Sequence, residues 1–115
     1  MHIKFMLLRA VLVAAFSMPL AALAQTTSDL VTAAGLGETA AVVALLDKGL
    51  NPDAQQGDGR TALMAAAASG HFETVKALMI RGAHKELTDA TGRTAFDYAF
   101  AAKHTDIIAL LRDAS

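Results

Sequence analysis

The histidines are the side chains of this sequence best suited to bind a metal ion or haem. His71, His84 and His104 lie beyond residue 24, and His71 and His104 are 33 positions apart. Histidines on successive stacked units would be about 10 Å apart, too far for both to bind one ion at about 2.1 Å. We therefore expect these two to be turn residues that pack against a neighbouring unit, and His84 to be solvated. A metal or haem carrier that uses His71 and His104 is the alternative.

The other polar side chains form no catalytic set. Asp53, Asp58, Glu86 and Asp89 fall in polar, turn-rich segments, where acids are usually solvated; an acidic recognition strip is the alternative. Gly57-Asp58-Gly59 is a turn rather than a phosphate-binding loop, and no serine has the surroundings of a nucleophile. The absence of cysteine excludes disulfides and thiolate metal sites. We therefore predict a protein that is not an enzyme and needs no cofactor.

Two arginines recur in equivalent surroundings. Arg60 follows Gly59 and Arg93 follows Gly92, again 33 positions apart. A pair of guanidinium groups can bind a carboxylate through parallel N–H donors. In the alternative interpretation, each arginine pairs with a nearby aspartate at the surface, an interaction worth about 0–1 kcal/mol.

These spacings belong to a 33-residue repeat that needs no insertion or deletion from Leu30 to Leu111. The segment Gly59–Leu63 (GRTAL) recurs as Gly92–Phe96 (GRTAF). A first unit matches the second where Leu30, Ala33, Ala34, Gly37, Val42, Leu45 and Gly49 align with Leu63, Ala66, Ala67, Gly70, Val75, Leu78 and Gly82. A period of this length is typical of architectures in which each unit packs on the next.

Each unit is predicted to form two short helices. In the middle unit, Thr61 can cap a helix that runs to about Ser69, and Gly70 can end it in the left-handed conformation. A second helix should start near Phe72 and end before Gly82. Helices of this length do not persist alone, so each must pack on its neighbours. The many alanines of the first helices allow that packing to be close.

This pattern resembles the ankyrin repeat over about residues 28–112. The resemblance rests on GRTALMAAA at 59–67, on Gly70-His71, on a hydrophobic second helix and on Gly82-Ala83. It implies an all-α solenoid within residues 25–115, with projecting β-turn or hairpin loops at about 51–59 and 84–92. The three ankyrin repeats would span about 28–55, 56–88 and 89–115.

The sequence departs from the family pattern at three places. Ala62 and Ala95 replace the family's proline, and Met64 and Asp97 replace its histidine. Lys103 stands where the other units have glycine, and a left-handed lysine costs about 1 kcal/mol. We therefore expect altered hydrogen bonding at the first helices and a strained turn at Lys103.

The resemblance further implies that the protein binds another protein through its loop tips and the concave face of its first helices. Carried onto this chain, the partner-binding surface comprises Gln56, Asp58, Arg60, Ser69, Asp89, Thr91 and Arg93. The only tyrosine, Tyr98, is expected to pack between helices. We expect a monomer that acts as an adapter, an accessory factor or an inhibitor of its partner.

Residues 1–24 have the pattern of a secretory signal peptide. Lys4 and Arg9 supply positive charge, an apolar run follows, and Ala22-Leu23-Ala24 places small residues where signal peptidase cleaves. The run is short for a membrane span of about 20 residues, so we expect cleavage between Ala24 and Gln25 rather than an uncleaved anchor. The remaining eight basic and eleven acidic residues give no nucleic-acid footprint. We expect a periplasmic or secreted protein that has no membrane contact after cleavage and binds a protein partner there.

Overall fold

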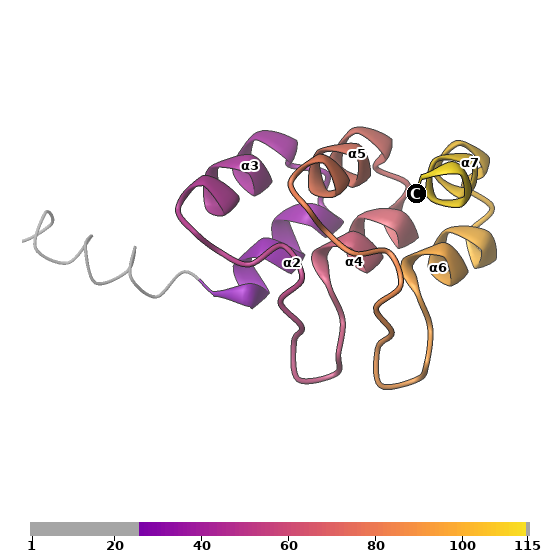
Figure 1. The fold of residues 1–115 in the computed structure, drawn as a ribbon, viewed down its shortest axis with the longest axis horizontal. Helices are drawn as coiled ribbons and strands as arrows, with labels where there is room; N and C mark the ends of the chain where they lie inside the picture. The colour runs from indigo at the N-terminus through magenta and orange to yellow at the C-terminus, as the bar shows by residue number, and fades with distance from the viewer. Residues whose placement is uncertain (1–25, 115) are drawn as a thin grey trace, which may run out of the picture.

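The computed structural model describes residues 26–114, and this range contains six helices and no strand (Figure 1). The helices are α2 (Thr27–Gly35), α3 (Thr39–Asp47), α4 (Ala62–Ser69), α5 (Phe72–Ile80), α6 (Ala95–Ala101) and α7 (Thr105–Asp113). The predicted all-α repeat solenoid is confirmed. The predicted signal peptide and its cleavage site lie outside the described residues. Within the described range, each helix is too short to cross a lipid bilayer.

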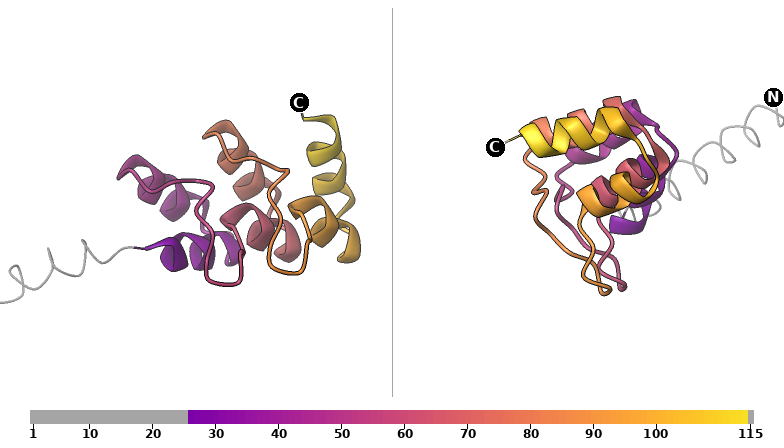
Figure 2. Two further views of the ribbon diagram at one scale, coloured as in Figure 1. Left: turned by 60° about the horizontal axis from the view of Figure 1, so that its bottom comes forward. Right: turned by 90° about the vertical axis from the view of Figure 1, so that its right-hand side faces the viewer.

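The helices form three pairs that stack in one direction. Helices α2, α4 and α6 pack side by side in an inner layer, and α3, α5 and α7 form an outer layer against it (Figure 1). The segments 48–61 and 81–94 connect the outer helix of one pair to the inner helix of the next. Both segments project from the same side of the stack (Figure 2). The fold therefore places two equivalent loops next to each other.

Threonine side chains fix where two inner helices begin. Thr61 Oγ1 accepts a hydrogen bond from the backbone N–H of Met64 at 3.3 Å, as its N-cap position predicts. Thr94 does the same for Asp97 at 3.3 Å, and Asp97 Oδ2 accepts in return from the Thr94 N–H at 3.0 Å. Hydrogen bonding is altered, as expected, where Met64 and Asp97 replace the family's histidine. Met64 is buried and its side chain carries no N–H or O–H group, and Asp97 completes a capping box with Thr94.

The turn between the two helices of a pair uses a left-handed residue. Gly70 ends α4 with φ of 82°, as predicted from its position. Lys103 adopts the same region with φ of 62° and is the only non-glycine residue with positive φ in the described range. The predicted strain at Lys103 is therefore localised at one backbone position, and the turn keeps its shape.

Small side chains make the close stacking of the inner helices possible. In α4, the buried alanines are Ala62, Ala65, Ala66 and Ala67. Larger apolar side chains, among them Leu30, Leu63 and Leu78, fill the space between the two layers and are fully buried. In the outer layer, the hydroxyl groups of Thr39 and Thr74 are hydrogen-bonded at 2.7 Å across the boundary between two repeats.

The first inner helix starts earlier than the repeat register predicts. Ala62, the first residue of α4, is equivalent to Asp29, but α2 begins at Thr27. The N–H of Thr26 donates to Asp29 Oδ2 at 2.8 Å. This contact stabilises two additional residues of helix at the N-terminal end of the stack.

Candidate functional site

Each projecting loop is closed by its own backbone hydrogen bonds. In the first loop, the N–H of Gln56 donates to the carbonyl of Arg60 at 2.9 Å. In the second, the N–H of Asp89 donates to the carbonyl of Arg93 at 3.0 Å. These equivalent bonds close the two loops in the same way, one repeat apart.

The two loops are also bonded to each other. The N–H of Ala90 donates to the carbonyl of Asp58 at 2.8 Å, and Gln55 Nε2 donates to the carbonyl of Thr88 at 2.9 Å. Gly59 lies at the closest approach, because a Cβ atom there would come within 2.9 Å of Ala90 N. The loops therefore form one continuous surface rather than two independent flaps.

A histidine–aspartate pair joins the bases of the loops. The backbone N–H of His84 donates to Asp53 Oδ1 at 2.7 Å, and the His84 ring bonds to Asp53 Oδ2. The hydrogen bond to Asp53 and its negative charge raise the pKa of His84 above its ordinary value. His84 is exposed, as predicted, but it makes a specific contact between repeats.

Arg60 and Arg93 come together at one aromatic ring. The guanidinium carbon of Arg60 lies 5.4 Å from the ring centroid of Tyr98, and that of Arg93 lies 5.9 Å from it. The Tyr98 hydroxyl donates to Asp89 Oδ2. Tyr98 stands on α6, but its side chain reaches the second loop, so it belongs to the site that sequence reasoning assigned without it.

The aspartates of the loop tips bond to the loops themselves. Asp89 Oδ1 accepts from the N–H of Thr91 at 2.9 Å, from its hydroxyl at 2.6 Å, and from the N–H of Arg93 at 3.1 Å. The bonds from Thr91 and from Tyr98 hold the pKa of Asp89 well below its usual range. Asp58 Oδ1 accepts from the N–H of Arg60 at 2.9 Å.

Neither guanidinium group of the pair has an acidic partner within residues 26–114. The ion pairs of that range involve Arg81 with Asp47, His84 with Asp53 and Arg112 with Asp113. Arg60 is half-buried, and its Nε is buried without a hydrogen-bond partner. An unmet buried donor costs about 1–3 kcal/mol. In the described residues, neither Arg60 nor Arg93 forms the ion pair with a nearby aspartate that the alternative interpretation expected.

The remaining predicted site residues lie at two separate places. Gln56 and Thr91 stand on the loops with the residues above, and Gln56 Nε2 lies 3.4 Å from Ser28 Oγ. Ser69 is exposed at the last residue of α4, whereas the loop joins the first residue of that helix. An eight-residue helix is about 12 Å long, so Ser69 and the loops occupy opposite ends of the inner layer.

His71 and His104 connect successive repeats. Their Nε2 atoms lie 3.1 Å from the carbonyl oxygen of Gly35 and 3.2 Å from that of Ala68. A Cβ atom at Gly37 would lie 2.5 Å from the His71 ring, so the glycine of one repeat leaves room for the histidine of the next. In the described residues, no group of three potential ligands could hold a metal ion. The expected contact of each histidine with a neighbouring repeat is present.

An apolar hollow also lies away from the loops. It is open to solvent between α5 and α7, and its lining residues are Phe72, Asp106, Ala109, Leu110, Asp113 and Ala114. The polar groups described above lie elsewhere, so this hollow is no part of the loop site.

Three stacked helix pairs with paired projecting loops define an all-α repeat solenoid. The family model described as ankyrin repeats (3 copies) matches residues 30–115. The chain belongs to the ankyrin-repeat family, as its resemblance predicted. Ankyrin repeats are general protein–protein interaction modules. A search of curated proteins gave no match to this chain.

Proposed function

We propose that this protein is exported and acts as an adapter, an accessory factor or an inhibitor of a periplasmic or secreted protein. It binds that protein, as a monomer and without a cofactor, through the loop tips and the concave face of its inner helices. It catalyses no reaction itself. It binds no nucleic acid, and it has no membrane contact once residues 1–24 are removed.

The observation that carries this proposal is the bonding between the two loops. The bonds from Ala90 to Asp58 and from Gln55 to Thr88 fix the loops relative to each other before any partner arrives. A surface that is already ordered loses little conformational entropy on binding. The polar side chains of the tips supply directional contacts on that surface, including those of Arg60 and Arg93.

Export is proposed on the pattern of residues 1–24. The positive residues, the apolar run and Ala22-Leu23-Ala24 are arranged as in a cleaved secretory leader. Mass spectrometry of the protein recovered from the periplasm tests this part. A mature chain that starts at Gln25 is expected, and one that retains Met1 would contradict the proposal.

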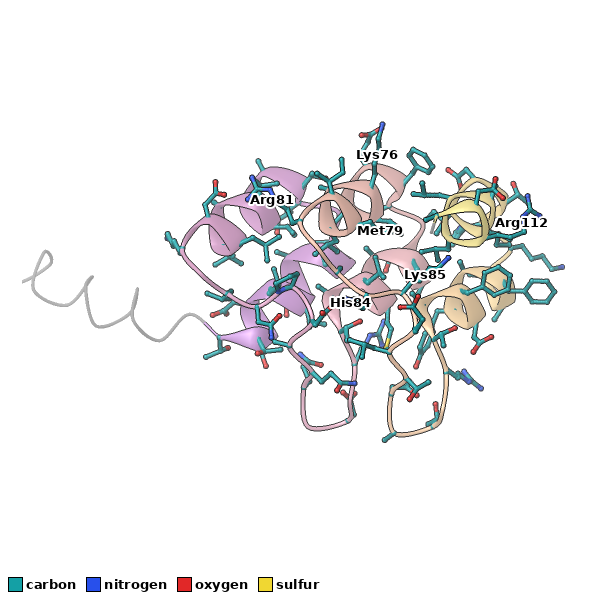
Figure 3. The ribbon with its side chains drawn as sticks, in the orientation of Figure 1. Lys76, Met79, Arg81, His84, Lys85 and Arg112 are labelled. Atoms are coloured by element: carbon teal, nitrogen blue, oxygen red, sulfur yellow. The ribbon has the colours of Figure 1, made fainter. Side chains whose placement is uncertain are left out.

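The binding face can be tested by blocking it. The chain has no cysteine, so a single Gly57→Cys or Lys76→Cys variant can be coupled to polyethylene glycol at one site. Gly57 has open space around it at the loop tip, and Lys76 lies on α5 on the side away from the loops (Figure 3). Both variants, immobilised by a C-terminal tag, are then compared for capture from a periplasmic extract.

We expect the polymer at position 57 to prevent capture of the proteins that the unmodified chain retains. The polymer at position 76 should leave capture unchanged. Equal capture by the two conjugates would show that the loops are not the binding face.

A further inference from the structure

We propose that Arg60, Arg93 and Tyr98 form a receiving site for a carboxylate group of the bound protein; this rests on the protein-binding function proposed above. The site lies where two loops and one inner helix meet. Arg60 comes from the first loop, Arg93 from the second, and Tyr98 from α6. The site therefore exists only when the second and third repeats are stacked.

The tyrosine ring brings the two positive charges together. Both guanidinium carbons lie within 6 Å of its centroid, at 5.4 and 5.9 Å. An aromatic face attracts a guanidinium through its quadrupole and forms no hydrogen bond with the N–H donors in the guanidinium plane. The hydroxyl bond from Tyr98 to Asp89 holds the ring in this position.

The local acids leave this charge available. Asp89 uses Oδ1 for three donors of its own loop and Oδ2 for Tyr98, and Asp58 accepts from the N–H of Arg60. Because these carboxylates are held by backbone and hydroxyl groups, they do not close over the guanidinium groups. Across residues 26–114, neither arginine has a salt bridge.

Arg60 also retains a donor that the protein does not use. Its Nε is buried and has no acceptor among the described residues. A small rotation of the Arg60 side chain toward an oxygen of the bound partner would give Nε a hydrogen-bond acceptor. A carboxylate suits the site best, because its two oxygens accept parallel bonds from a guanidinium fork, and a second guanidinium adds to the charge complementarity.

The carboxylate can come from an aspartate or glutamate side chain of the partner or from the end of its chain. Three short peptides separate these sources: acetyl-Gly-Gly-Glu-Gly-Gly-amide, the same peptide with Gln in place of Glu, and acetyl-pentaglycine with a free terminal carboxylate. Each is titrated into the ¹⁵N-labelled protein. The Nε–H signals of Arg60 and Arg93 and the ring signals of Tyr98 are followed by NMR.

We expect saturable shifts of these signals with the Glu peptide, the terminal-carboxylate peptide or both, with dissociation constants of order millimolar. The Gln peptide should cause none. A response to one carboxylate peptide alone identifies the source. The Arg60→Lys/Arg93→Lys double variant should weaken binding at least tenfold because the forks are lost, whereas Arg81→Lys, remote from the ring, should leave it unchanged.

Equal shifts with the Gln peptide, or no shifts at the two arginines with any peptide, would overturn the carboxylate site. That result is distinguishable from failure of the proposed function. If the polymer at position 57 still blocks capture, the loops bind a protein through other contacts. If the polymer has no effect on capture, the proposed binding face itself is wrong, whatever the peptides show.

Discussion

Lys103 carries a local cost that the other repeats avoid. Its φ of 62° requires the left-handed conformation that Gly70 supplies at the equivalent turn. We expect Lys103→Gly to raise the free energy of unfolding by about 1 kcal/mol, since glycine adopts this region without a Cβ penalty. Urea denaturation checks the gain. Lys103→Ala is the control, because it removes the lysine charge but keeps the Cβ; an equal gain there would mean that charge, not backbone conformation, sets the cost.

His84 makes the link between the loop bases sensitive to pH. Because Asp53 raises the pKa of His84 in the folded protein, the protonated histidine stabilises the fold. This contribution is complete below the unfolded pKa of about 6.5 and is lost as the pH rises through the raised folded pKa. We expect the melting temperature of the wild type to fall relative to that of His84→Asn as the pH rises above about 6.5.

The same comparison in an Asp53→Asn background isolates the cause. Without the carboxylate, the pH-dependent difference between the chain that keeps His84 and the chain with the His84→Asn change should disappear. If it persists, another acid such as Glu86, whose charge also raises the pKa of His84, is responsible.

At the scale of elements, substitutions at Gly59 and Gly92 can distinguish the contact between the two loops from the backbone conformation of each loop. Both have positive φ, 80° and 82°, so replacement by alanine carries the same backbone cost of about 1–2 kcal/mol. Only at Gly59 would the added Cβ meet the next loop, at 2.9 Å from Asp89 Cα; at Gly92 it meets nothing within 4 Å. We expect Gly59→Ala to destabilise the protein by about 1–3 kcal/mol more than Gly92→Ala.

Urea denaturation of the two variants measures this difference. Equal losses would show that the loops do not depend on their mutual contact. That outcome would also argue against the proposed binding surface, because the order of the loops before binding depends on this contact.

The ends of α4 and the start of α6 could be predicted from the sequence because each has a local chemical signal. Thr61 and Thr94, one repeat apart, cap their helices, and Gly70 ends α4, as their residue types predict. The early start of α2 was not predicted, since it depends on a contact between Thr26 and Asp29 outside the repeat pattern. Met79 on the second helix of its repeat is half-buried and packs at the edge of the core.

The site was predicted in part. The positions of Arg60 and Arg93 follow from the 33-residue period, but Tyr98 does not, because its equivalent in the middle repeat is the buried Ala65. Its role depends on a long side chain that extends from a helix to a loop, and periodicity carries no information on that direction. The pairing of Asp53 with His84 is likewise a contact between two loops, so their sequence separation of 31 residues concealed it.

At the scale of the whole molecule, burial comes from stacking. Ala67 is 0% exposed because α6 covers it, whereas the equivalent Phe100 is 65% exposed on α6 itself. Each repeat is thus stabilised mainly by its neighbours, as expected for a solenoid. With three repeats the stability should be modest, and a partner that binds only the folded chain will raise it. Because the loops belong to two repeats and are bonded to each other, we expect a partner that binds both loops to stabilise their stacking.

The proposed contact of Arg60 and Arg93 with the partner can be measured by isothermal titration calorimetry with the partner purified after capture. The titrations use the wild type, Arg60→Glu/Arg93→Glu, and Arg81→Glu/Arg112→Glu as a control of equal charge change. Arg81 and Arg112 are exposed and each pairs with an aspartate, whereas the guanidinium groups at the Tyr98 ring are those of Arg60 and Arg93. We predict at least a hundredfold loss of affinity for the loop variant, about 2.7 kcal/mol, and less than a threefold change for the control. Equal affinity of the loop variant and the wild type would contradict the account.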